Sequence, residues 1–358
     1  MSLLVARRQE SAFDEAAART KRKRLMRTWA ITILAMALLS VWLMPLGYAG
    51  VTSLKTRSQV SDTPILPTEI ATFEFEGRNL EVFEVPLDDG VRELALVTRG
   101  RESAEFVDPD DPAAGLITWE GRWRTLEPVR SLSFAWENYP EAWDKINFPR
   151  LLFWTSFYAT ITLLGAVISS AFVAYGFARF RFRGRGVLFM VLMATIILPP
   201  AVTQVPSYAF FTWIGWTGTW LPLIVPQFFG NAYNVFLLRQ YFLTIPTEME
   251  QAAAVDGAGP LKTFLYVILP QAVPALTAVS LFHFFFAWND FFGPLIYLTS
   301  NRAIQPISVG LTFFSGVYDS EPQLIMAAAF ITLAIPLVIF FFAQRVFIQG
   351  IVITGVDK

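Results

Sequence analysis

The chain has 358 residues, of which 54% are hydrophobic, 15% aromatic and only 16% charged, with a mean hydropathy of +0.47. Soluble domains carry about 25% charged residues, so this deficit excludes an ordinary soluble domain and indicates a protein solvated by lipid. A formal net charge of −1 gives no sign of nucleic acid as a partner, and the lack of Cys excludes disulfides and thiolate chemistry.

Six apolar segments are long enough to cross a bilayer, which takes about 17–25 residues per helix. The segments are Trp29–Gly50, Leu151–Gly176, Gly186–Phe211, Trp220–Tyr241, Gln271–Leu298 and Leu324–Phe347. Small residues around Ala49 also fit a cleaved signal peptide. The first apolar run, about 20 residues, exceeds the 7–15 of a signal core, so we expect an uncleaved anchor.

The placement of Lys and Arg predicts how the chain is oriented in the membrane. Residues 1–28 hold eight Lys/Arg against three acids, and the loop 178–185 holds four Arg and no acid. Residues 51–147 instead hold 19 Asp/Glu against ten Lys/Arg. We therefore expect a cytoplasmic tail 1–28, a first span 29–50, an external insert 51–147, a permease core 148–347 with a cytoplasmic loop 243–270, and a cytoplasmic tail 348–358.

The external insert alternates apolar and polar residues, which predicts a small β-rich domain. The alternating apolar residues are Phe73, Phe75, Leu80 and Val82, with Val85 as a further candidate. Strands are expected at 80–85, 93–98, 104–107 and 116–123, between turns at 88–90, 99–101 and 108–112. The acids of the last turn lack the ligand spacing and terminal Glu of a calcium loop, which favours a solvated turn over a metal site.

Within the loop 243–270, the stretch GAGPLKT (257–263) superficially resembles a phosphate-binding loop. Leu261 stands where the second Gly belongs, Pro260 removes an amide donor, and no strand precedes the stretch. The single His, His283, lies among Phe residues of the fifth span and is interpreted as a packing residue. No catalytic set assembles, so we expect a transport subunit rather than an enzyme, with no cofactor or metal bound by this chain.

Local signals predict two short helices in this loop instead. The first starts after Thr247 as N-cap and carries Glu248 and Glu250 in its first turn, where the helix dipole favours acids. Gly257 ends it because glycine is free to take positive φ. Pro260 is acceptable in the first turn of the second helix. The simplest interpretation is an amphipathic connector on the membrane surface.

The same stretch resembles the EAA loop of ABC importer permeases, E-A-A-x(3)-G-x(9)-I-x-L-P. The matching residues are Gln251, Ala252, Ala253, Gly257, Val267, Leu269 and Pro270. Gln251 in place of the motif's Glu is the one clear departure, with Glu250 one residue earlier. AYGFARFRFRGR, LRQYFLTIPTE, FAWNDFFGPL and AQRVFIQGIVITGV are similar to the maltose-type, sugar-importing branch, over about Trp136–Lys358 and the first span. The external insert resembles forms found in alpha-glucoside importers.

This resemblance implies an all-α polytopic membrane protein with the six transmembrane helices of the type I importer permease fold and a β-rich extracytoplasmic insert between helices 1 and 2. It implies a pore subunit that moves a sugar or oligosaccharide, with an alpha-glucoside favoured, by alternating access in a bacterial inner membrane. The implied partners are a second, related permease, two copies of a cytoplasmic ATPase that binds ATP and Mg, and an extracytoplasmic solute-binding protein. The implied ATPase-coupling residues are Glu248, Glu250, Gln251, Ala252, Ala253, Asp256, Gly257 and Ala258.

Neutral polar residues within the spans are candidates for a sugar path because polar groups in a bilayer usually face a cavity or another helix. The spacing of Gln227, Asn231 and Asn234 predicts one helix face. Asn289 and Asp290 are further candidates; all five also fit helix–helix hydrogen bonding or, for the last two, a capped helix break. Two alternatives remain: the same mechanism for a non-sugar solute such as glycerol phosphate or an amino acid, or an ion-coupled secondary transporter.

Overall fold

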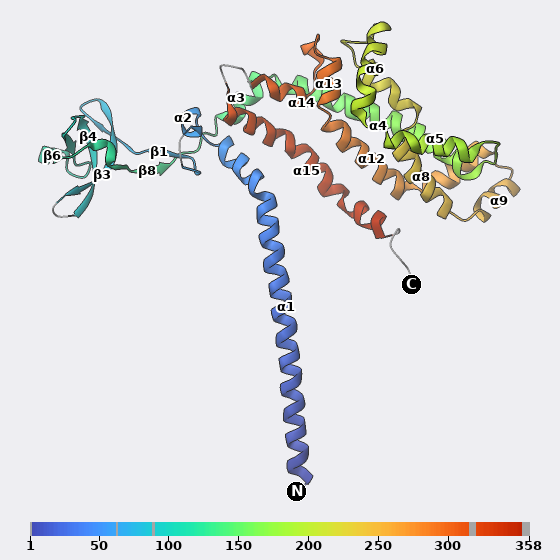
Figure 1. Ribbon diagram of the computed structural model, residues 1–358, viewed down its shortest axis with the longest axis horizontal. Helices are drawn as coiled ribbons and strands as arrows, with labels where there is room; N and C mark the ends of the chain where they lie inside the picture. Colours follow the sequence, from blue (N-terminus) through green and yellow to red (C-terminus); the bar gives the residue numbers. More distant parts are fainter. Residues whose placement is uncertain (1, 62–63, 88–89, 315–319, 353–358) are drawn as a thin grey trace. The chain divides into compact units, whose positions relative to one another are not determined.

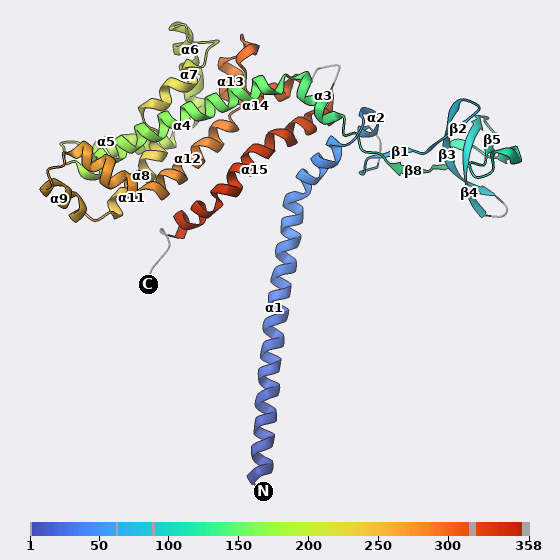
Figure 2. The same cartoon turned by 180° about the vertical axis from the view of Figure 1, so that it is seen from behind.

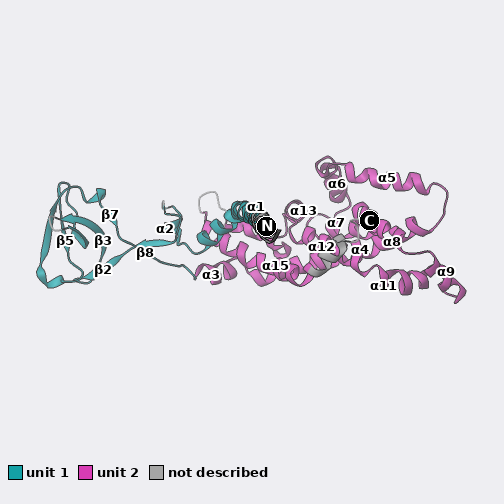
Figure 3. Cartoon of the chain, turned by 90° about the horizontal axis from the view of Figure 1, so that it is seen from below, with its two compact units in different colours: residues 1–136 teal, residues 137–358 magenta. Residues whose placement is uncertain are grey.

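The computed structural model describes residues 2–61, 64–87, 90–314 and 320–352. The chain divides into two compact units, residues 1–136 and residues 137–358 (Figure 3). The expected turn at Asp88 and Asp89 and the end of the expected tail, 353–358, lie outside the described residues.

The first unit begins with one continuous helix, α1 (Ser2–Ser53), visible in blue in Figure 1. Its part Lys21–Ser53 is long and apolar enough to cross a membrane and contains the predicted first span. Trp42 is 83% exposed within the unit, which suits a side chain solvated by lipid. The short helix α2 (Arg57–Val60) follows, closed at its start by a capping box between Thr56 and Gln59.

The predicted β-rich domain is confirmed as two antiparallel sheets. Its strands are β1 (Thr68–Ile70), β2 (Thr72–Phe75), β3 (Arg78–Leu87), β4 (Gly90–Thr98), β5 (Ser103–Val107), β6 (Leu116–Glu120), β7 (Glu127–Pro128) and β8 (Arg130–Leu132), with 3₁₀ turns η1 (Pro112–Ala114) and η2 (Trp123–Thr125). The larger sheet has the order β2-β3-β4-β5-β6, and β7 also pairs with β3; β1 pairs with β8. Each of the four strands predicted from alternation is present.

Both faces of the larger sheet are covered by apolar side chains. Phe83 lies opposite Leu94 and packs with Val85 and Phe106 on one face, while Val82 packs on the other. The alternation predicted for Phe73, Phe75, Leu80 and Val82 is confirmed, since these four residues pack together on that second face, whereas Val85, the further candidate, packs on the first. Val82 and Val85 are an odd number of positions apart, and successive side chains of a strand point to opposite faces.

The second unit is helical. Its longer helices are α3 (Asn138–Lys145), α4 (Phe148–Arg179), α5 (Arg185–Ile197), α6 (Pro200–Trp213), α8 (Ala232–Thr244), α9 (Glu248–Val255), α12 (Val273–Trp288), α13 (Phe292–Tyr297) and α15 (Pro322–Val352). Shorter elements are α7 (Leu221–Ile224), η3 (Val225–Phe229), α10 (Pro260–Thr263), η4 (Phe264–Ile268), α11 (Leu269–Gln271), η5 (Arg302–Ile304), α14 (Ile307–Gly310) and η6 (Leu311–Phe314). Helix α4 packs against α8 and α12, and α12 packs against α15 (Figures 1 and 2).

Membrane spans in the described residues number four by length and composition, or up to six if each of two bent helix pairs is one span. The predicted third span is not a straight helix, because α5 and α6 meet at 98°. Leu198 is extended there, as steric conflict with the following Pro199 requires. The predicted fifth span, Gln271–Leu298, is interrupted after Trp288, where α12 ends, and α13 begins at Phe292. At the start of this span, Pro260–Gln271 and α12 meet at 79°.

The segment around Gly230 is packed closely on α4. A Cβ at Gly165 would come 2.7 Å from the ring of Phe228. Ser169 Oγ donates to the carbonyl oxygen of Gln227 and accepts from the amide of Gly230 at 3.1 Å. Small and hydroxyl residues therefore bring α4 against η3 in the way that membrane helices usually approach one another.

The expected insert 51–147 is not a single piece. Residues 51–53 continue α1, and α3 belongs to the helical unit, where it packs against α15. Lys145 at the end of α3 forms an ion pair with Glu321 just before α15. The acidic composition of α3 resembles that of the insert, which is why composition alone did not separate them.

Candidate coupling site

Helix α9 (Glu248–Val255) starts after Thr247 and ends before Gly257, as predicted, and lies at the end of the helical unit that is far from α3 (Figures 1 and 2). Glu248 and Glu250 occupy its first turn, as predicted. Thr247 is the N-cap residue, as predicted, but its side chain makes no capping hydrogen bond. Its backbone is already helical, with φ −69° and ψ −23°, whereas a residue whose side chain caps a helix usually has an extended backbone.

The C-terminus of α9 forms a Schellman motif. The amide of Ala258 donates to the carbonyl oxygen of Ala253 at 2.9 Å, and that of Gly257 donates to Ala254 at 3.1 Å. Gly257 has φ +80°, which confirms the predicted glycine turn. Asp256 is the C-cap residue between these bonds. The turn therefore fixes the direction in which the chain leaves α9 toward Pro260, where α10 begins as predicted.

An ion pair joins α9 to α4. Nε of Arg179, at the end of α4, lies 2.6 Å from Oε1 of Glu250, and the two side chains are only 9% and 21% exposed. Nη2 of Arg179 also donates to the carbonyl oxygen of Ile245 at 2.7 Å. A single guanidinium thus ties both the first turn of α9 and the residue that follows α8 to the membrane-spanning α4.

The second anchor of the loop is aromatic. Phe264, directly after α10, is 1% exposed. Its ring stacks on Tyr175 of α4 with centroids 4.6 Å apart, and Phe172 and Phe242 complete its surroundings at 5.0 and 6.3 Å. Such ring pairs add to the free energy gained by burying the aromatic surface. The loop is therefore attached to α4 and α8 at two points, with α9 between them.

The outer surface of the loop carries both apolar and polar side chains. Val255 is 88% exposed, Leu261 58% and Tyr266 77%. Gln251 and Ala252 are exposed, whereas Ala253 is buried. Ala253 therefore faces its own chain, whereas Ala252 lies on the exposed side of α9.

Glu250 and Gln251 face different surroundings, which bears on the departure from the EAA motif. The carboxylate of Glu250 forms an ion pair with Arg179, and the side chain of Gln251 is exposed. Glu250 therefore faces α4, whereas Gln251 lies on the exposed side of α9. Neither Arg179 nor Phe264 was singled out from the sequence, although Arg179 lies in the Arg-rich loop that was used only to predict orientation.

The predicted helix face of polar residues on the fourth span is not formed. Gln227 lies in the 3₁₀ turn η3, and Gly230 with φ +85° separates it from α8. Asn231 is the N-cap of α8 and accepts from the amides of Tyr233 and Asn234. Asn234 is buried, and its Nδ2 atom has no hydrogen-bond partner among the described residues. The structure thus brings Asn231 and Asn234 together but gives Asn231 a capping role.

The other two candidates lie at the break after α12. Asn289 Nδ2 donates to the carbonyl oxygen of Phe285 within its own helix. Asp290 accepts from Tyr158 Oη at 2.8 Å and from the amide of Gly293 at 3.1 Å. These bonds account for Asp290 as a cap that links α4 to the start of α13. The side chain of His283 is buried, its ring lies 6.2 Å from Phe286, and Nε2 has no partner among the described residues.

We expect the turn at Gly257 to be required for the loop to bind the ATPase subunit. Gly257→Pro removes the amide that bonds Ala254 and forces φ to negative values, and Gly257→Ala is strained at φ +80° by about 1–2 kcal/mol. The measurement is the amount of ATPase subunit that stays bound to tagged chain after mild solubilisation. Gly259→Ala is the matched control, since φ is −72° there and nothing lies within 4 Å of the added Cβ. Equal retention by all three variants would contradict a role for the turn.

The apolar helical unit, whose helices are long enough to cross a membrane several times, defines a polytopic membrane protein. The chain belongs to the family of binding-protein-dependent transport system inner membrane components, which it matches over residues 162–353. It is therefore the permease subunit of an ABC importer of a bacterial inner membrane, a transport component rather than an enzyme.

Similar proteins agree with this assignment. The chain is 34% identical to the osmoprotective compounds uptake permease protein GgtD of Synechocystis, over 56% of this chain and 68% of that protein. It is 27% identical to the alpha-glucoside transport system permease protein AglG of Rhizobium meliloti, over 79% of this chain and 75% of that protein. A solved chain of a bacterial ABC transporter involved in import of the acidic polysaccharide alginate matches 89% of this chain and 96% of its own length, with 20% identity and a TM-score of 0.61. This likeness shows the fold, that of the type I importer permeases.

Proposed function

We propose that this chain is one of two pore-forming permease subunits of an ATP-driven importer for a sugar or oligosaccharide, with an alpha-glucoside as the favoured cargo. The observation that carries the coupling mechanism is the attachment of α9 to α4 through Arg179 and Phe264, with exposed apolar side chains beside it. The choice of an alpha-glucoside as cargo is based on the similarity to AglG. That match covers 296 residues, more than the family segment 162–353, so it includes residues of this chain outside that segment.

In this proposal α5 and α6 form one span and α12 begins another after loop 243–270; with the four long apolar helices this gives six spans with both chain ends in the cytoplasm. The β-rich domain then lies outside the cell membrane, because one span precedes it. Loop 243–270 falls on the cytoplasmic side, where an ATPase is available. The Lys/Arg bias of residues 1–28 and 178–185 supports this orientation.

The mechanism follows from the two anchors. Two copies of a separate ATPase subunit bind ATP and Mg and close around the nucleotide. Helix α9 contacts one of these copies and transmits the closing movement. Because Arg179 and Phe264 fix the loop to α4 and α8, a displacement of α9 moves these helices rather than bending the loop. A second, related permease completes the pore, and an extracytoplasmic solute-binding protein delivers the solute. Alternating access then results from the change between two packed arrangements.

One experiment tests this function directly. Tagged protein is solubilised mildly, its co-purifying chains are identified, and the complex is reconstituted in vesicles with its binding protein. We expect ATP-dependent uptake of an alpha-glucoside such as maltose, and no uptake of cellobiose, which has the β linkage. Uptake driven by a proton or sodium gradient without ATP would overturn the proposal.

Gln251→Glu restores the residue that the EAA motif carries. Because the side chain of Gln251 is exposed and makes no hydrogen bond among the described residues, the substitution leaves the chain's own packing unchanged. We expect retention of the ATPase subunit to be unchanged or higher, by up to about fivefold for one exposed charge pair. Retention is measured by pull-down beside Gln240→Glu, an exposed glutamine on α8. A loss of binding by Gln251→Glu alone would show that the motif is aligned incorrectly.

A further inference from the structure

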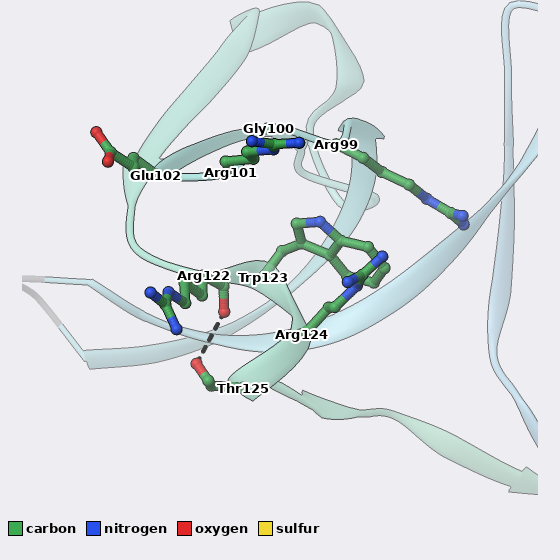
Figure 4. A pocket seen from close by; sticks show the side chains of 8 residues that line it. All are labelled: Arg99, Gly100, Arg101, Glu102, Arg122, Trp123, Arg124 and Thr125. Carbon is green, nitrogen blue, oxygen red and sulfur yellow. Dashed lines mark hydrogen bonds between the residues drawn. The ribbon is translucent and has the colours of Figure 1, made fainter.

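A pocket in the β-rich domain is lined by four arginines and a tryptophan (Figure 4). It lies between the turn that joins β4 to β5 and the turn that follows β6. The pocket residues are Arg99, Gly100, Arg101, Glu102, Arg122, Trp123, Arg124 and Thr125. Its volume is about 780 Å³, within the range of about 300–1,000 Å³ that small-molecule sites occupy.

The two turns are held together by backbone contacts. The amide of Gly121 donates to the carbonyl oxygen of Glu102 at 2.7 Å. A Cβ at Gly100 would come 2.0 Å from the carbonyl oxygen of Ser103, and one at Gly121 would meet the ring of Trp119 at 2.3 Å. Thr125 Oγ1 donates to the carbonyl oxygen of Arg122, drawn as the dashed line in Figure 4. The walls of the pocket are thus built from turns that tolerate little change.

The pocket concentrates positive charge in an acidic segment. Residues 51–147 carry 19 Asp/Glu and ten Lys/Arg, yet the pocket has four Arg and one Glu. Arg99 pairs with Glu81 at 3.0 Å. In the part of the chain that the structure describes, Arg101, Arg122 and Arg124 form no ion pair with an acid. Three guanidinium groups therefore have hydrogen-bond donors available for a ligand.

Two of the four guanidinium groups of the pocket lie over the ring of Trp123. The guanidinium carbons of Arg99 and Arg124 lie 5.1 and 5.3 Å from the centre of its ring. The ring itself is fixed by an edge contact with Phe83 of the sheet core, 6.1 Å between centroids. Cation–π contacts restrict where a guanidinium can be, so less freedom is lost when it binds an anion.

We propose that this pocket binds a small soluble polyanion carrying two or more oxyanion groups, carboxylate or phosphate. A planar guanidinium matches both groups with two parallel hydrogen bonds. The pocket is concave and holds separate guanidiniums on its two turns, so a ligand with two charged groups meets both turns at once. The pocket belongs to the first unit and the coupling loop to the second, and the proposal does not depend on which solute is imported.

The test uses the full-length chain in nanodiscs of neutral lipid at low ionic strength, with isothermal titration calorimetry. Citrate is the carboxylate probe, pyrophosphate the phosphate probe and myo-inositol a neutral probe of comparable size that is not an alpha-glucoside. We expect saturable binding of citrate, pyrophosphate or both, no binding of myo-inositol, and weakening as salt is added because exposed charges are screened. Which of the two anions binds more tightly identifies the ligand's charged group.

Arg101→Gln should weaken anion binding about tenfold and Arg101→Gln with Arg122→Gln about a hundredfold, since each removes a charge-assisted pair of bonds. Arg78→Gln is the matched control: Arg78 is an exposed arginine of the same domain, at the start of β3, and is not part of the pocket. Equal thermal unfolding of all variants shows that the domain is intact. Absence of anion binding, equal binding of myo-inositol, or an equal effect of Arg78→Gln would overturn the proposal.

Discussion

Arg179→Met is expected to release the coupling loop from α4 and to leave the chain in the membrane. Removing one partner of a largely buried ion pair costs about 3–5 kcal/mol, because the remaining charge is left without compensation. Glu250 is 21% exposed and the lost bond to Ile245 adds to the effect. Since 1.4 kcal/mol changes an equilibrium about tenfold, we expect the rate of transport-coupled ATP hydrolysis by the reconstituted complex to fall at least tenfold.

The pairing itself is tested by a double-mutant cycle. Glu250→Gln alone should also weaken coupling, and the double variant should be less impaired than the sum of the two, because each single change leaves the other group unpaired. Arg181→Met is the matched control, since Arg181 is an exposed arginine of the same loop. Strict additivity, or an equal effect of Arg181→Met, would show that the ion pair does not support coupling.

Local signals in the sequence predicted the coupling loop well. The acids of the first turn, the glycine at 257 and the proline at 260 each act on neighbouring backbone, so the bounds of α9 could be derived without knowing the rest of the fold. The strands of the β-rich domain were predicted for the same reason, since alternation is a local pattern. Thr247 is the predicted N-cap, but its side chain makes no capping hydrogen bond because its backbone is already helical.

What the sequence did not predict depends on contacts between distant segments. The partner of Glu250 comes from α4, and the residues around Phe264 come from α4 and α8; neither can be read from spacing along one helix. Length and apolar composition also cannot show a bend inside a span. Leu198 before Pro199 was a signal for one such break, and Gly230 before Asn231 was a signal for another, because both are common at helix ends.

Phe264→Ala is expected to detach the second half of the loop. Truncating a fully buried Phe costs about 3–5 kcal/mol through lost transfer free energy and the cavity that remains. The cavity lies among Tyr175, Phe172 and Phe242, whose rings belong to helices that are fixed by other contacts and cannot close around it. The midpoint of thermal unfolding in detergent should fall by several degrees, and retention of the ATPase subunit should fall with it.

The comparison that separates anchoring from general stability uses two further variants. Phe264→Leu keeps most of the apolar volume, so it should recover most of the thermal stability but not the ring contact with Tyr175. Leu265→Ala removes an apolar side chain that is 41% exposed at the next position and should leave the unfolding midpoint nearly unchanged. If Leu265→Ala lowered the midpoint as much as Phe264→Ala, the buried ring could not be the anchor. If Phe264→Ala lost stability yet kept full ATPase retention, α9 would be held through Arg179 alone.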